Sequence, residues 1–318
     1  MQSQFKNLLQ LQRYFKDELV CVQYLENARW NGKPYCPHCG SDHYYRTKTR
    51  FKNPELKDYK DFRCKACDKK YTVLTGTIYE ASKIQLKTWF AAVYLCTAHK
   101  KGISSHQLGR DLGITQKTAW FVLHRVRAML QVNEPELLRG EVEIDETYIG
   151  GKESNKHKAD RNKDENGTTL KVNNKAAVIG AVQRDGNIMV KHVNSVGKKA
   201  IKEFIISNID DSANISTDEH GGYKHLTSIG FKHQSVRHAV GEYVRGTVHT
   251  NTIEGAWSLL KRGIIGIYHS VSVKHLHRYC VEFEYRYNTR KINDAERFED
   301  ALTKTGNTRL LYKTLISD

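Results

Sequence analysis

The stretch His249–Arg262, which reads H-T-N-T-I-E-G-A-W-S-L-L-K-R, decides how the rest of this chain is interpreted. The apolar residues that recur at helical spacing within it and just beyond it are Ile253, Trp257, Leu260 and Ile264. They predict a helix with one buried stripe. Glu254 and Lys261 stand seven residues apart, which is two helical turns, so their Cβ directions differ by only about 20°. A carboxylate and an ammonium group would therefore project together from the outer side of this helix.

The same residues also have a purely structural interpretation. Asn251 followed three residues later by Glu254 is the pattern of an N-cap with its capping-box partner. On this stretch alone, capping explains both residues better than catalysis does. A catalytic interpretation requires further carboxylates elsewhere in the chain.

The charge balance points to a polyanionic partner. The chain has 318 residues with 51 Lys and Arg against 35 Asp and Glu, a formal net charge of +16. Such an excess favours nucleic acid, and this length has room for two or more domains. An anionic membrane is the competing partner, but the chain has no long apolar run, and Met1–Lys6 does not begin a secretory signal. We therefore expect a cytoplasmic, nucleoid-associated protein with no membrane contact.

Two cysteine motifs predict a structural zinc site. C-P-H-C at 36–39 and C-K-A-C at 64–67 are separated by 24 residues, and the polar insert Thr47–Lys60 can form a loop between them. The predicted ligands are Cys36, Cys39, Cys64 and Cys67. Each C-x-x-C turn supplies two thiolates to a closed tetrahedral site, and two such turns argue against a redox pair. Cys21, Cys96 and Cys280 lie in apolar stretches and are expected to be buried small side chains.

The next segment has the outline of a helix-turn-helix. A helix is expected over 82–100, a second over 106–112, a break at Gly113, and a third helix over 116–132 that begins after Thr115. The residues expected to face inward on the third helix are Ala119, Val122, Val126 and Leu130. The residues then available to phosphates or base edges are Gln116, Lys117, His124 and Arg127. An ordinary helical hairpin is the alternative, and the basic balance together with the adjacent zinc motif favours DNA binding.

Acidic residues appear where the composition changes. Glu141–Ile149 alternates apolar and acidic residues like a strand, which places Glu141, Glu143 and Asp145 on one face. That face could be solvated or could hold a divalent metal. The lysine-rich segment Lys152–Lys175 has no periodicity and predicts a flexible loop.

The following elements continue an α/β pattern. A hairpin is expected from Ala176–Val182 and Asn187–Val193 across an Asp-Gly turn, followed by a helix over 198–209 and a short strand over 214–218 that ends at Asp218. Strand, hairpin, helix, strand and a later helix is the element order of a ribonuclease-H-like domain. In that fold an acid from the first strand, one from the fourth and one from a later helix converge at the edge of the sheet. The residues at those places are Asp145, Asp218 and Glu254.

Four motifs carry a resemblance to a known family. They are the paired C-x-x-C turns, E-I-D-E-T-Y-I-G-G from Glu143, T-D-E-H-G-G-Y from Thr217, and H-T-N-T-I-E-G-A-W-S-L-L-K-R-G from His249. With these motifs, residues 30–290 resemble the DDE-type insertion-sequence transposases of a bacterial group related to the eukaryotic Merlin elements. The family's catalytic acids match Asp145, Asp218 and Glu254, with Lys261 as the partner two turns after the third. Some members have Asn as the third residue, so Asn251 is the alternative there.

The resemblance implies a function and its cofactors. Two Mg²⁺ or Mn²⁺ ions about 3.5–4 Å apart would be held with Asp145 between them and with Asp218 and Glu254 on one ion each. Water would cut the DNA at the element's end, and the freed 3′-hydroxyl would then join that end to target DNA. Lys261 would contact a phosphate, the N-terminal domains would bind the terminal inverted repeats, and the protein would act as a homodimer or larger assembly. The alternatives are a non-catalytic DNA-binding regulator and a structure-specific nuclease.

The expected organisation is α/β with preceding DNA-binding modules. A helical element over 1–33 is followed by the zinc ribbon over 34–80 and the helix-turn-helix over 81–135. The ribonuclease-H-like catalytic domain is expected over 138–292 and a C-terminal tail over 293–318. Within the first element, residues 5–29 have a helical pattern with an apolar stripe.

Overall fold

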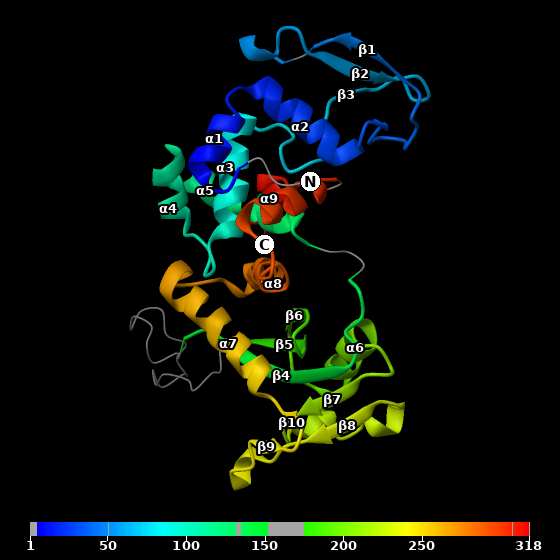
Figure 1. Cartoon of the computed structure of the whole chain (residues 1–318), viewed down its shortest axis with the longest axis vertical. Helices are drawn as coiled ribbons and strands as arrows, with labels where there is room; N and C mark the ends of the chain where they lie inside the picture. The colour runs from blue at the N-terminus through cyan, green and yellow to red at the C-terminus, as the bar shows by residue number, and fades with distance from the viewer. Residues whose placement is uncertain (1–4, 50, 132–134, 152–174, 307, 318) are drawn as a thin grey trace, which may run out of the picture. The chain divides into compact units, whose positions relative to one another are not determined.

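The computed structural model describes the chain except for residues 1–4, 50, 132–134, 152–174, 307 and 318. It divides into two compact units (Figure 1): one combines Met1–Gln131 with Thr289–Asp318, and the other is Val132–Asn288. The predicted loop over 152–175 lies outside the described residues except for Lys175. No helix in the described part of the chain is long and apolar enough to cross a membrane.

Helices from both ends of the chain build the core of the first unit. The helices that meet there are α1 (Leu8–Tyr14), α2 (Glu18–Trp30), α3 (Leu86–Ala98) and α9 (Asp294–Thr303). The ring of Phe90 on α3 lies 4.8 Å from that of Phe15 and 5.5 Å from that of Phe298 on α9. The segment 293–318, expected to be a tail, thus contains a core helix, and a short helix α10 (Tyr312–Ile316) follows it.

The helical element expected over residues 5–29 consists of two helices, α1 and α2. The break falls at Phe15–Asp17, where Phe15 turns its buried ring into the aromatic core. Asp17 then starts α2 as its N-cap, because its side chain accepts a hydrogen bond from the Val20 N–H at 2.9 Å. Most of the predicted apolar stripe is buried, but Leu9, which the pattern included, is 66% exposed. The interruption by a cap was not predicted.

The first cysteine motif precedes a small antiparallel sheet, and the second connects two of its strands. Its strands, in the order β1-β2-β3, are β1 (Tyr44–Lys48), β2 (Lys60–Cys64) and β3 (Lys70–Tyr71). The insert expected as a loop begins within β1 and contains a 3₁₀ turn, η1 (Pro54–Leu56). Phe62 on β2 is fully buried and stacks on Tyr71 at 5.1 Å, which gives this small sheet an aromatic core.

A tight turn joins α4 (Ser105–Leu112) to α5 (Gln116–Met129). Gly113 ends α4 in the left-handed conformation at φ 64°, and Thr115 caps α5 by accepting from the Thr118 N–H. A Cβ on Gly109 would lie 2.9 Å from the Ile114 carbonyl oxygen, so this glycine lets the turn fold closely onto α4. Local sequence signals therefore explain this helix pair.

The second unit is built on a mixed five-stranded sheet in the order β6-β5-β4-β7-β8. The strands are β4 (Glu141–Ile149), β5 (Ala176–Gln183), β6 (Ile188–Val193), β7 (Asn214–Thr217) and β8 (Lys232–Ser235). The pairs β4–β5 and β5–β6 are antiparallel, whereas β4–β7 and β7–β8 are parallel. The predicted hairpin is confirmed: Asp185, at φ 55°, lies in the turn between β5 and β6. The short polar strand β8 was not predicted.

Helices cover both faces of this sheet. On one face, α6 (Lys198–Asn208) packs its Phe204 into a core with Val142 and Ile144 of β4. On the other face, α7 (Asn251–Gly263) and α8 (Val273–Asn288) share a core with Val178 and Val182 of β5. Because β4 alternates, Glu143 and Asp145 lie on the face of α7. The predicted apolar stripe of α7 is confirmed, since Ile253, Trp257, Leu260 and Ile264 are all buried.

Side chains of α8 satisfy the open edge of β6. The Val190 N–H donates to Glu284 Oε2 at 2.9 Å, and the Ile188 N–H donates to Asn288 Oδ1 at 2.7 Å. The Asn288 amide in turn donates to the Ile188 carbonyl. Burial raises the pKa of Glu284 to about 7. An edge strand that would otherwise offer free backbone groups is thereby closed by one helix.

Candidate active site

The four cysteine sulfurs form a group with the dimensions of a zinc site. The Sγ atoms of Cys36 and Cys67 are 3.7 Å apart, those of Cys39 and Cys64 are 3.6 Å apart, and all four lie within 4.8 Å of one another. A tetrahedron of thiolates about 2.3 Å from zinc has edges of about 3.8 Å. The backbone N–H of Cys67 lowers the pKa of the Cys64 thiol to about 6. The cluster supports a structural Zn²⁺.

The α4–α5 pair exposes less of α5 than the sequence predicted. Gln116 and Lys117 are exposed, and the inward positions Ala119, Val122, Val126 and Leu130 are buried as expected. His124 and Arg127 were predicted to face DNA, but their exposed fractions are 0% and 1%. Six consecutive residues, 122–127, are buried, which is more than one helix face provides. The second half of α5 is therefore largely enclosed, and the exposed residues of the helix lie in its first turn.

The first turn of α5 is tied to α4 and remains accessible. The Gln116 side-chain amide donates to Ser105 Oγ at 2.9 Å, which links the starts of the two helices. Lys117 extends beside this pair with its Nζ 5.2 Å from the centre of the Tyr312 ring. These two exposed polar residues are the part of α5 that is accessible to a phosphate or a base.

In the second unit, parallel strand pairing brings two of the predicted acids to neighbouring places. Glu143 of β4 pairs with Ser216 of β7, and two residues further along each chain stand Asp145 and Asp218. Burial raises the pKa of Asp145 to about 7, with further contributions from the carboxylates of Glu146 and Asp218. Asp218 accepts a hydrogen bond from the His220 N–H at 3.0 Å. Asp145 therefore sits in the field of two further carboxylates that raise its pKa.

Glu146 belongs to this acidic group, although the sequence analysis did not select it. It accepts a hydrogen bond from the Tyr223 hydroxyl at 2.7 Å, and its other oxygen is 3.8 Å from His220 Nε2. Both partners belong to the T-D-E-H-G-G-Y motif that follows β7. That motif thus supplies Asp218 and also holds the acid next to Asp145. The adjacency of Glu146 to Asp145 was visible in the sequence, but its partners were not.

Trp257 of α7 fixes the orientation of Asp145. Its indole Nε1 donates to Asp145 Oδ2 at 3.0 Å. The β5 residue paired with Asp145 is Gly180, and a Cβ built there would lie 2.3 Å from the Trp257 ring. A glycine in the middle of an apolar strand often marks such a close approach. Gly180 therefore makes the space in which the indole reaches the carboxylate.

The N-terminus of α7 is capped from a distant strand. Glu143 is fully buried, and its Oε2 accepts from the Thr252 and Ile253 N–H groups at 2.8 and 3.1 Å. Its Oε1 receives Arg184 Nε at 2.7 Å and lies 3.1 Å from His249 Nδ1. A carboxylate at this end of a helix is favoured by the free N–H groups and by the helix dipole. Glu143 is thus a structural residue that positions α7.

This arrangement corrects the capping interpretation of Asn251 and Glu254. The N-cap position is Thr250, whose side chain makes no capping hydrogen bond, and Asn251 is already the first helical residue. The Thr250 hydroxyl instead donates to Glu254 Oε1 at 2.8 Å. The Asn251–Glu254 capping box is therefore absent, because Glu143 has taken its place.

Glu254 and Lys261 lie exposed on the outer side of α7, as their spacing predicted. The Glu254 side chain is 48% exposed, and its Oε1 lies 3.9 Å from His238 Nε2. Among the described residues, the four cysteines are the group of His, Cys, Asp or Glu side chains whose ligand atoms lie close enough together, within 4.8 Å, to hold one metal ion. The carboxylates of Asp145, Asp218 and Glu254 are therefore more widely spaced than the cysteine sulfurs.

Family comparisons agree with both units. The family model described as "transposase zinc-ribbon domain" matches residues 16–70, and the model described as "ISXO2-like transposase domain" matches residues 137–288. The chain belongs to this transposase family. The second match coincides closely with the unit Val132–Asn288, and the first includes α2, so this helix goes with the zinc ribbon. The chain is also 28% identical to the "uncharacterized protein in transposable element ISH50" of Halobacterium salinarum over 278 residues, 86% of this chain and 91% of that protein.

Loss of zinc should unfold the zinc ribbon of this transposase. Cys36→Ser, Cys64→Ser or a chelator should disorder residues ~34–75, because structural zinc supplies folding free energy directly. Elemental analysis and limited proteolysis would measure the effect. His38→Ala is the matched control, since His38 is exposed between two ligands and should leave the zinc content at one ion per chain. Zinc-free protein with an intact ribbon would contradict the assignment.

Removing the charge of Glu143 should strongly destabilise the second unit. Glu143→Gln leaves the Arg184 guanidinium and the α7 N-terminus without their counter-charge, a loss of about 3–5 kcal/mol. Urea denaturation would measure the free energy of unfolding. Glu141→Gln is the control, because Glu141 lies on the same face of β4, is 41% exposed and should cost less than about 1 kcal/mol. Equal losses in the two variants would show that Glu143 does not hold α7.

Proposed function

We propose that this transposase cuts the ends of an insertion sequence and joins them to target DNA, using the second unit as a ribonuclease-H-like catalytic domain. The observation that carries the proposal is the β4–β7 register, which leads to Asp145 and Asp218 at neighbouring places. Three antiparallel strands followed by two parallel ones, with helices on both faces, support the ribonuclease-H-like assignment. The Trp257–Asp145 hydrogen bond ties α7, which carries Glu254, to the same part of the sheet.

The chemistry of these acids suits divalent cations. Asp145 is pushed toward protonation by burial and by neighbouring carboxylates, a repulsion that a cation would relieve. Asp145, Asp218 and Glu254 would hold Mg²⁺ or Mn²⁺, and hard carboxylate oxygens are the ligands these ions prefer. When bound, two such ions activate the attacking oxygen and stabilise the leaving one. Asn251, exposed one turn before Glu254, is the alternative third ligand.

The protein's own side chains would orient the DNA and the acids. Trp257 holds one oxygen of Asp145 and thereby aims the other. Lys261 extends from the same exposed side of α7 as Glu254 and would contact a backbone phosphate as a point charge.

The first unit would recognise double-stranded DNA at the element's ends. The α4–turn–α5 pair would act as a helix-turn-helix, an assignment that its tight turn supports, and Gln116 and Lys117 on the exposed first turn of α5 are the residues proposed to read the terminal repeat. The zinc ribbon would add phosphate contacts. Because two ends must be joined in one event, we propose a homodimer or larger assembly on DNA.

Neutralising any one of the three acids should abolish catalysis without unfolding the protein. Asp145→Asn, Asp218→Asn and Glu254→Gln should each lower Mg²⁺-dependent cleavage and strand transfer on pre-cut DNA by more than roughly 100-fold, beyond the cost of losing a second-shell partner. Asn251→Ala should leave both rates within a few-fold of the unaltered protein. An active Glu254→Gln with an inactive Asn251→Ala would move the third ligand one turn back. If all three acid variants keep their activity, the acids are not catalytic, and a DNA-binding regulator becomes the better description of the protein.

The Asp145→Asn variant also provides a folding control. The pKa of Asp145 is raised from 3.8 in the unfolded chain to about 7 in the folded protein. Between these two values folded Asp145 keeps its proton while unfolded Asp145 has lost it, so the free energy of unfolding falls as the pH rises toward 7. Asp145→Asn should remove this dependence and raise the free energy of unfolding at pH 8 by about 1–3 kcal/mol. An inactive but more stable variant separates lost chemistry from lost folding.

Binding to the element's ends should depend on the first turn of α5. Lys117→Ala should weaken binding and reduce the log–log salt slope by about 0.9, the value for one phosphate contact. Gln116→Ala should weaken binding with little change in slope. Fluorescence anisotropy on terminal-repeat duplex would measure both, with Lys199→Ala on α6 as the control, since its side chain is 91% exposed. A Lys117→Ala variant that binds like the parent would make the helix pair structural.

A further inference from the structure

The segment 236–249, named here the arm, connects β8 to α7. It contains the short antiparallel pair β9 (Val244–Arg245) and β10 (Val248–His249), which turns at Gly246 with φ 62°. In Figure 1 the arm (yellow) lies at the N-terminal end of α7. The C-terminal end of the arm is held by the Arg184 guanidinium, which donates to the carbonyls of Thr247 and His249 at 2.6 and 3.3 Å. Arg184 thereby joins the arm to Glu143.

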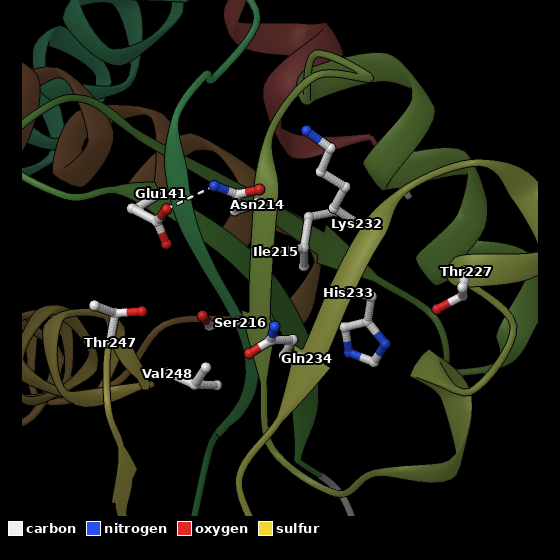
Figure 2. Close-up of a pocket in the computed structure, with 10 residues that line it drawn as sticks. All are labelled: Glu141, Asn214, Ile215, Ser216, Thr227, Lys232, His233, Gln234, Thr247 and Val248. Atoms are coloured by element: carbon white, nitrogen blue, oxygen red, sulfur yellow. Dashed lines mark hydrogen bonds between the residues drawn. The ribbon is translucent and has the colours of Figure 1, made fainter.

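The arm and the sheet together line a cavity of about 450 Å³. Thr247 and Val248 line it from the arm, and residues of β7 and β8, among them Ser216 and Gln234, line it from the sheet (Figure 2). The buried side chains of Val236 and Val248 anchor the two ends of the arm. The residues between these two anchored ends are mostly exposed and are therefore available to a partner.

Large apolar side chains are exposed on the arm. Val240, Tyr243 and Val244 have exposed fractions of 74%, 58% and 52%, and all three fall within five residues. Single exposed apolar residues are normal on a protein surface, but a cluster on a projecting element marks a binding surface.

The arm reaches the proposed catalytic acids through a histidine. His238 Nε2 lies 3.9 Å from Glu254 Oε1, and the rings of His238 and Tyr243 are 5.1 Å apart at an angle of 34°. Exposed Arg237 and Arg245 flank these rings. Glu242, the acid of the arm, lies against the Arg237 backbone N–H, so the side chains that face outward are mainly basic and apolar.

We propose that the arm binds single-stranded DNA beside the active site, with Tyr243 as the surface on which an unpaired base stacks. This inference rests on the proposed function, which places the scissile phosphate at Glu254. A nucleotide strand offers the two chemistries that the arm complements, a planar base for Tyr243 and phosphates for Arg237 and Arg245. Base stacking on an aromatic side chain tolerates any sequence, which suits the varied DNA flanking an element's end.

A second copy of the chain is the competing occupant of this surface. A protein interface would bury Val240 and Val244 as well as Tyr243, and it would not need the flanking arginines. The charge of the arm and of the chain as a whole, +16, disfavours contact between two like surfaces. DNA is therefore the better match, and oligomeric state serves as an outcome of the test.

The experiment measures strand binding in protein that cannot cut DNA. Full-length Asp145→Asn protein is titrated into fluorescein-labelled oligothymidylate and, separately, into labelled duplex, without added Mg²⁺. Adding Tyr243→Ala should weaken binding to the single strand by roughly 5- to 150-fold, the effect of one stacked base, and leave duplex binding unchanged. Tyr243→Phe, which keeps the ring, should bind like the parent. Ile206→Ala on α6 is the matched control, since Ile206 is 55% exposed on the other face of the sheet.

Several outcomes would overturn the proposal. They are single-strand binding that Tyr243→Ala leaves unchanged, an equal loss in Tyr243→Phe or Ile206→Ala, and a DNA-free oligomer that Tyr243→Ala dissociates in light scattering. Cleavage by the unaltered protein is assayed in parallel. If the unaltered protein does not cleave DNA, the proposed function is contradicted. The role of the arm is decided by the binding measurements alone.

Discussion

One buried carboxylate connects the two elements that form the candidate site. Glu143 of β4 neutralises the N-terminus of α7 and pairs with Arg184, which also holds the arm. Trp257 returns from α7 to the same strand at Asp145. Strand and helix are thus linked at two points, so the position of Glu254 depends on contacts that Glu254 itself does not make. Removing the charge at Glu143 would leave buried N–H donors and a partly buried guanidinium without their counter-charge, which is why this interaction determines the geometry around it.

The first unit uses the same device. The side chain at the N-cap of α3, Gln85, makes no capping bond, and the buried Glu18 of α2 accepts instead from the Leu86 and Lys87 N–H groups at 2.8 and 2.9 Å. A remote cap of this kind satisfies the helix end and at the same time joins two elements. In both units a glutamate therefore performs a structural task that a rule based on local spacing would assign to a residue next to the helix.

Glu143 and Asp145 show how neighbouring acids on one strand face take different roles. Glu143 is surrounded by donors and a guanidinium, so its charge is used within the fold. Asp145 has the Trp257 indole on one oxygen and the fields of Glu146 and Asp218 around it, and its pKa rises to about 7. An acid with unrelieved repulsion lowers stability, a cost that a bound cation would remove. The contrast lies in their surroundings, since both are carboxylates two residues apart on β4.

The sequence by itself determined the features that depend on neighbours along the chain: the paired C-x-x-C turns, the alternation of β4, the Asp-Gly hairpin and the stripe of α7. Assigning Asp145, Asp218 and Glu254 to metal remains a prediction. Only the tertiary structure decided that Glu143 caps α7, that Gly180 admits Trp257, and that His124 and Arg127 are buried. Periodicity identifies one inward face of a helix, but whether its other faces are covered depends on residues distant in sequence. Burial, capping by a distant residue and the proximity of acidic residues from different strands all result from tertiary packing, so the local sequence pattern does not predict them.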